Sequence, residues 1–79
     1  MQKNELVSVM KRYGDRQEDL AKYIGISLQQ FNKKINQKDG ADFTRGEIQK
    51  IIEKYNLSAE DIHLIFFTSD VSSEDMNNG

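Results

Sequence analysis

Four of the helical segments that can be read from the sequence open with a short polar residue that is followed three positions later by an acid or an amide. This is the spacing of a capping box at the start of a helix. The four pairs are Asp15–Glu18, Ser27–Gln30, Thr44–Glu47 and Ser58–Asp61. Apolar residues after each pair recur at intervals of three and four, as on the buried face of a helix. The chain has no proline and no useful run of alternating polarity. We therefore expect an all-α fold without a sheet.

Five helices can be placed in the sequence. They are expected over residues 4–13, 15–23, 27–36, 44–55 and 59–67. Asn4 is the expected N-cap of the first helix, and Gly14 and Gly25 are the expected stops of the first two. Short connections favour a compact five-helix bundle. Its expected core is Leu6, Met10, Leu20, Ala21, Ile24, Ile26, Phe31, Ile35, Phe43, Ile48, Ile52, Leu57, Ile62 and Phe66.

The composition excludes several classes of protein. With 79 residues the chain is one small domain, and it has no cysteine and one histidine, His63. It therefore lacks the residues for a disulfide framework, a Cys-ligated metal or a multi-His site. No Gly-rich phosphate loop or nucleophile–base set is present, so we expect neither an enzyme nor a cofactor nor a metal site. No apolar run approaches the roughly 20 residues of a membrane span, and a soluble cytoplasmic protein is expected.

The net charge of −2 conceals a gradient along the chain. Residues 1–54 hold all 11 Lys and Arg and 8 acids, for +3, whereas residues 55–79 hold 5 acids and no base, for −5. The stretch from Thr68 is rich in Ser, Asp and Asn and has few large apolar residues. Such a segment buries too little surface to offset its ordering entropy. We expect a folded domain over residues 1–67 and an acidic disordered tail over 68–79.

Residues 16–36 form the most informative stretch. Ala21 is small where a second helix must cross closely, and Gly25 supplies the positive φ that the connecting turn needs. Ser27 can cap the following helix, which Phe31 and Ile35 hold against the preceding one. A helix, a short glycine turn and a second helix form the layout of a DNA-binding helix-turn-helix. A plain αα-corner is the structural alternative.

This stretch resembles the helix-turn-helix of the phage repressors and Cro proteins, the lambda Cro/CI-like or XRE family. The resemblance extends over residues 3–67 and is carried by Gln17, Leu20-Ala21, Ile24-Gly25-Ile26-Ser27, Phe31 and Ile35-Asn36. It implies a lambda-repressor-like domain that binds operator DNA, in a bacterial or phage-infected cell. By the same resemblance, Gln17 occupies the position that touches the DNA backbone. Ser27 and Leu28 join the expected base-reading residues, although relatives often have a polar residue where Leu28 stands.

The outward face of the helix that starts at Ser27 follows from its periodicity. With about 100° per residue, Gln29, Asn32 and Lys33 lie away from the side of Phe31 and Ile35. Gln and Asn can pair with adenine, and Lys can donate to guanine. No acid occurs between Ser27 and Gln37. This local absence of acids favours contact with DNA in a chain that is acidic overall.

Contacts to phosphate are expected from helix starts and loop cations. A helix start offers backbone N–H groups and the positive end of the helix dipole. Besides Gln17, we expect Asn36 and Lys38 to bind phosphate. The start of the fourth helix, at Phe43, Thr44 and Arg45, is expected to form a second clamp.

The fifth helix has more apolar surface than one stripe requires. We expect Leu64, Ile65 and Phe67 to form the contact of a homodimer on a palindromic operator. Of these, Ile65 can also face the core, and Phe67 can alternatively fold back over the first helix.

The leading interpretation is a small transcriptional regulator that needs no small-molecule ligand. The competing class is a protein-interaction module, such as an antitoxin or antirepressor with the same fold.

Overall fold

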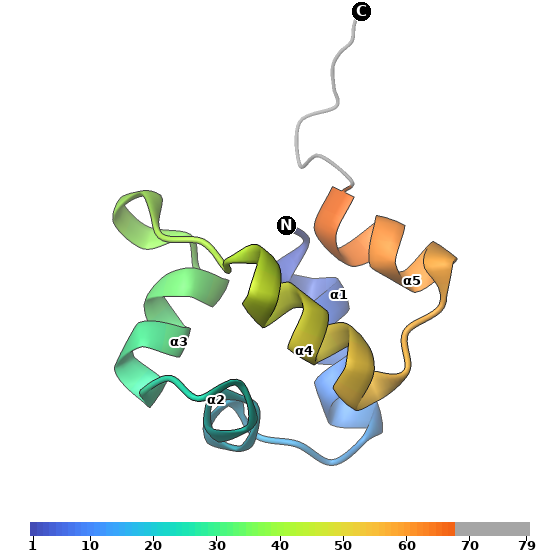
Figure 1. Cartoon of the computed structure of the whole chain (residues 1–79), viewed down its shortest axis with the longest axis horizontal. Helices are drawn as coiled ribbons and strands as arrows, with labels where there is room; N and C mark the ends of the chain where they lie inside the picture. The colour runs from blue at the N-terminus through green and yellow to red at the C-terminus, as the bar shows by residue number, and fades with distance from the viewer. Residues whose placement is uncertain (68–79) are drawn as a thin grey trace, which may run out of the picture.

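The computed structural model describes residues 1–67, so the expected acidic tail lies outside the described residues. Within residues 1–67 every regular element is helical and no strand occurs, which confirms the expected all-α, five-helix fold (Figure 1). The elements are α1 (Lys3–Arg12), α2 (Gln17–Ile24), α3 (Leu28–Ile35), the short 3-10 turn η1 (Lys38–Gly40), α4 (Arg45–Tyr55), α5 (Ala59–Ile62) and the π-helical turn η2 (His63–Phe67).

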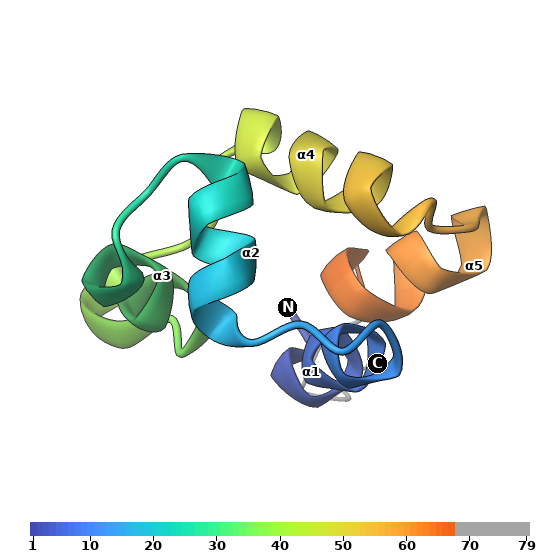
Figure 2. The ribbon, with the colours of Figure 1, turned by 90° about the horizontal axis from the view of Figure 1, so that it is seen from below.

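The helices enclose a single core. Helix α2 packs against both α3 and α4, and α1 packs against η2. Figure 2 shows α3 at one end of the molecule with α2 beside it, α4 along the top and α1 at the bottom. The two ends of the described chain meet, because the backbone N–H of Gln2 donates to the carbonyl of Ile65 at 2.7 Å. One long face of α3 lies on the outside of the molecule, where Gln29, Asn32 and Lys33 are exposed.

The core differs from the expected one mainly in α4. The buried hydrophobic residues are Leu6, Val9, Met10, Leu20, Ala21, Ile24, Phe31, Ile35, Phe43, Ile51, Tyr55 and Ile65. In α4 the buried stripe is centred on Ile51 and Tyr55, whereas Ile48 and Ile52 are only partly buried. The expected core residues Ile26, Leu57, Ile62 and Phe66 are also only partly buried. Four of these residues still pack against the buried core and form its margin, namely Ile26, Ile48, Leu57 and Phe66. In α4 the buried stripe differs from the expected one because apolar spacing alone does not determine how far a helix is rotated about its axis.

A polar network allows Tyr55 to occupy the core. Its hydroxyl donates to Asp15 Oδ2 at 2.7 Å, and Lys54 Nζ lies 3.3 Å from the same oxygen. Tyr13 donates to the Tyr55 carbonyl at 3.1 Å, and Lys54 lies over the Tyr23 ring. Burial and the neighbouring Asp15 carboxylate raise the pKa of Tyr55 far above its ordinary value. The Tyr55 hydroxyl therefore remains protonated and can donate its hydrogen bond to Asp15. This bond connects the α1–α2 turn to the end of α4.

Two of the expected N-caps were wrong, and this network explains the one at Asp15. The Asp15 carboxylate serves Tyr55 and Lys54, so α2 begins after Arg16, whose backbone N–H donates to Asp19 Oδ2 at 2.8 Å. The cap of α1 is Gln2, and Asn4 lies inside the helix.

The other three signatures do mark helix starts. Ser27 and Gln30 form a reciprocal capping box, as do Thr44 and Glu47. The Ser58 hydroxyl accepts the backbone N–H of Asp61 at 3.1 Å.

Gly25 determines the angle between α2 and α3. It ends α2 in the left-handed conformation, with φ 95° and ψ 28°. Its N–H and that of Ile26 both donate to the Ala21 carbonyl, at 2.9 and 3.0 Å. A side chain at such a φ is strained, and glycine removes that strain.

We predict opposite effects of adding a methyl group at two glycines. Gly25→Ala should lower the free energy of unfolding by about 1–2 kcal/mol because alanine resists the left-handed conformation. Gly46→Ala, in the first turn of α4, should raise it by about 0.5 kcal/mol because alanine favours the helix. Neither methyl would meet another atom within 4 Å, so urea unfolding of the two variants compares backbone effects. Equal shifts for both variants would refute this account.

Candidate nucleic-acid interface

The outer face of α3 is a shallow, polar hollow of about 260 Å³. Its lining residues share two properties, since all are exposed and none is acidic. They are Gln29, Asn32, Lys33, Asn36 and Lys38. The structure thus brings together three expected base-reading residues and two expected phosphate-binding residues. In Figure 1 this part of the molecule, α3 and the η1 turn, forms one end of the bundle.

Helix α3 presents this face because its opposite side is anchored. Phe31 and Ile35 are fully buried, and the Phe31 ring packs against that of Phe43 at 5.6 Å between centroids. The Ser27 hydroxyl accepts the Gln30 N–H at 3.1 Å and fixes where the helix begins. Such anchoring limits rotation of α3 about its own axis, so the polar side chains keep a constant orientation.

Two amides of the hollow are held within the chain. Asn32 Nδ2 donates to Gln17 Oε1 at 3.2 Å, which joins the start of α2 to the face of α3. Asn36 Nδ2 donates to the Asn32 carbonyl at 2.9 Å. These contacts orient the amide groups toward defined directions. The expected phosphate-binding Gln17 therefore lies directly beside the expected base-reading Asn32.

The other three side chains of the hollow are not engaged by the described part of the chain. Within residues 1–67, Gln29, Lys33 and Lys38 make no side-chain hydrogen bond or ion pair. A ligand could therefore be bound by one amide and two ammonium groups without breaking any contact of the fold.

The first turn of α3 holds the two remaining base-reading candidates. The Ser27 oxygen is engaged in capping, although its hydroxyl hydrogen can still be donated. Leu28 is 47% exposed, so a large apolar side chain faces solvent at the start of the polar face.

Sequence reasoning missed Lys3. Its Nζ donates to Asn36 Oδ1, from a position 33 residues earlier in the chain. No pattern in the sequence indicates this contact, which arises because the start of α1 lies beside the end of α3.

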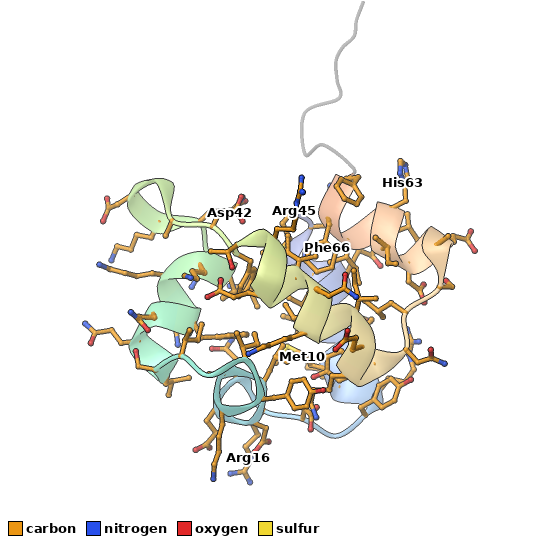
Figure 3. The ribbon with its side chains drawn as sticks, viewed as in Figure 1. Met10, Arg16, Asp42, Arg45, His63 and Phe66 are labelled. Atoms are coloured by element: carbon orange, nitrogen blue, oxygen red, sulfur yellow. The ribbon has the colours of Figure 1, made fainter. Side chains whose placement is uncertain are left out.

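At the start of α4, where a phosphate clamp was expected, two backbone N–H groups already donate to carboxylates of the chain. The side chain of Phe43 is buried in the core. Its N–H donates to Asp42 Oδ1 at 2.8 Å, and the N–H of Thr44 donates to Glu47 Oε1 at 2.9 Å. A phosphate would have to displace both carboxylates to use these two donors. In Figure 3 the Arg45 side chain projects upward from the start of α4, whereas α3 lies to the left.

Lys34 serves the fold rather than the hollow. Its Nζ lies 2.7 Å from both carboxylate oxygens of Glu47, and both side chains are largely buried. Partial burial alone would raise the pKa of Glu47. The hydrogen bonds from Lys34 and Thr44 and the charge of Lys34 outweigh it, so the pKa lies below the ordinary value of 4.5. This pair joins α3 to the capped start of α4.

The expected dimer residues divide into two groups. Leu64 is 41% and Phe67 is 68% exposed, so Phe67 does not fold back over α1. Ile65 is 1% exposed and belongs to the core, where it packs with the other buried residues. Including Ile65 in an exposed contact was therefore a wrong prediction, because η2 turns this side chain inward.

Two negative findings apply to the described part of the chain. Residues 1–67 contain no group of His, Cys, Asp and Glu that could hold a metal ion. None of the described helices has the length and apolar character to traverse a bilayer.

Comparison with known proteins returned no family model, no curated protein and no solved structure that matches the chain.

We predict that Glu47 makes stability depend on pH in the acidic range. Its pKa is depressed in the folded protein. The stabilisation is thus fully present above the unfolded-state pKa of about 4.3 and is lost as the pH falls through the folded-state value. Urea midpoints between pH 7 and pH 3 should fall less steeply for Glu47→Gln than for the wild type. Parallel curves would show that the Lys34–Glu47 pair does not contribute.

Proposed function

We propose that the chain is a sequence-specific double-stranded DNA-binding protein that places α3 in the major groove. The observation that carries this proposal is the acid-free hollow on α3, lined by three amides and two lysines. B-DNA offers a groove about 12 Å wide that admits an α-helix, and its base edges carry donors and acceptors. Amides and ammonium groups on a rigid helix are suited to read them.

The arrangement of α2, the left-handed Gly25 and α3 supports assignment to the lambda-repressor-like, XRE type of helix-turn-helix. In this assignment α2 lies across the DNA backbone and α3 enters the groove. The contact between Gln17 and Asn32 supports it further, because one helix start and one reading residue form a unit. The function that fits is a small phage- or prophage-like transcriptional regulator of the Cro or repressor type.

The residues of the hollow divide into two roles in this proposal. Gln29 and Lys33 stand one helical turn apart on α3, and we assign them to adenine and guanine edges respectively. Lys38 lies on η1 beside the helix, and we assign it to phosphate.

We predict that two lysine variants separate these roles. Lys33→Ala should cost about 1–3 kcal/mol of specific binding and reduce discrimination between sites. Lys38→Ala should weaken binding to all duplexes similarly and reduce the salt dependence of affinity. Duplexes selected from a random pool supply the specific site, and fluorescence anisotropy measures both affinities across a salt series.

Lys11→Ala is the matched control, since Lys11 is exposed at the far end of α1. Equal, sequence-independent losses for Lys33→Ala and Lys38→Ala would contradict the division of roles. Selection that enriches no sequence would refute the proposed function.

We further propose that two copies bind a palindromic site through Leu64 and Phe67. Exposed large apolar side chains are typical of interfaces, and two half-sites double the few cationic contacts of one copy. Phe67→Ser should abolish dimers on operator DNA while leaving the fold intact, because Phe67 is exposed. Light scattering of the protein–DNA complex measures this, and a 1:1 complex for the wild type would refute it.

One observation favours the alternative, a protein-interaction module such as an antitoxin or antirepressor. Leu28 exposes an apolar side chain on the proposed reading helix. Leu28→Gln should leave DNA binding intact or improve it if α3 reads DNA. A wild type that selects no duplex sequence, but binds a protein partner that Leu28→Gln loses, would favour the alternative.

A further inference from the structure

A second hollow adjoins the one on the face of α3. It has a volume of about 340 Å³ and lies where the start of α1 meets the end of α3. Its lining residues are Met1, Gln2, Lys3, Asn4, Ile35, Asn36 and Gln37. Asn36 lines both hollows, so the two form one continuous strip. No acidic residue lines either part of this strip.

Lys3 is the residue with a cationic side chain in the lining of the second hollow. Its Nζ donates to the neutral amide oxygen of Asn36, and no described carboxylate pairs with it. The ion pairs of residues 1–67 are Arg16–Glu18, Lys34–Glu47 and Lys54–Asp15. The lysines along the strip, Lys3, Lys33 and Lys38, are outside all three pairs. They come from α1, α3 and η1, and the tertiary fold brings Lys3 to the other two, which are close in the sequence.

We propose that Lys3 binds a phosphate of the DNA backbone at the edge of the groove that receives α3. The proposal rests on the proposed function, since it adds a contact to the same complex. A helix in the major groove is flanked by two phosphate backbones. Lys38 lies in the hollow on α3, and Lys3 extends the positive strip past Asn36 into the second hollow.

The exchange at Lys3 is chemically favourable. In the free protein its ammonium donates to an uncharged amide, and in the complex it donates to an anionic phosphate oxygen. Both hydrogen bonds have the charged ammonium as donor, but only the bond to phosphate adds attraction between opposite charges and releases counterions from the DNA. The Asn36 side chain keeps its own contact to the Asn32 carbonyl, so the amide stays in position after the exchange. The contact therefore requires movement of one flexible side chain only.

The experiment compares Lys3→Gln with Lys11→Gln on the selected duplex and on a scrambled one. Lys11 belongs to the same helix, near its opposite end, and is absent from the lining of both hollows. Lys3→Gln should weaken binding to both duplexes by the same factor, about fivefold at 0.15 M salt for one lost phosphate contact. The slope of log affinity against log salt should fall by about 0.9 per bound chain. Lys11→Gln should change neither quantity.

Lys3→Arg distinguishes a phosphate contact from a structural role. It keeps the charge and should retain wild-type affinity and slope, whereas a purely structural link to Asn36 would be disturbed by both substitutions. Thermal unfolding of each variant establishes that it is folded. If Lys3→Gln binds like Lys11→Gln while Lys33→Ala still loses specificity, the phosphate site is wrong and the proposed function stands. If the wild type selects no sequence, both are wrong.

Discussion

The left-handed turn at Gly25 is the constraint on which the rest of the site depends. It ends α2 at φ 95° and allows the chain to reverse within three residues, so that α3 packs directly on α2. Phe31 and Ile35 can then be fully buried, and the opposite side of α3 must face outward. The polar hollow is thus a consequence of backbone conformation and burial. A residue with a Cβ at this turn would oppose the geometry that orients the hollow.

The fold also sorts the charges of the chain. Glu47 and Asp15 hold Lys34 and Lys54 in partly buried pairs that join α4 to α3 and to the α1–α2 turn. Lys34 and Lys54 are therefore neutralised within the fold, although a count of charges in the sequence would include them among the cations available to an anionic partner. The strip formed by the two hollows contains three lysines and no acid. A chain that is acidic overall thereby presents one local surface suited to a polyanion, with a weak long-range field and contacts at short range.

Much of the fold could be predicted because the signals are local. The capping boxes at Ser27 and Thr44 mark real helix starts, since a cap needs only residues three positions apart. The same rule failed at Asp15, because a tyrosine 40 residues away engages its carboxylate. The rotation of α4 could not be predicted for a related reason. Tyr55 became a core residue only because Asp15 satisfies its hydroxyl, a contact that helical periodicity does not record.

The helices, the position of the glycine turn and the polar side of α3 can all be predicted from the amino-acid sequence, because each depends on spacing within a few residues. Which charges are neutralised, and which residues meet across the fold, depends instead on how the helices pack. Lys3 joins Asn36, Lys34 joins Glu47 and Ile65 turns into the core, and each outcome depends on packing between distant segments. A helix start is stabilised by a capping pair three residues apart in the sequence. A surface consists of residues from distant segments that packing brings together.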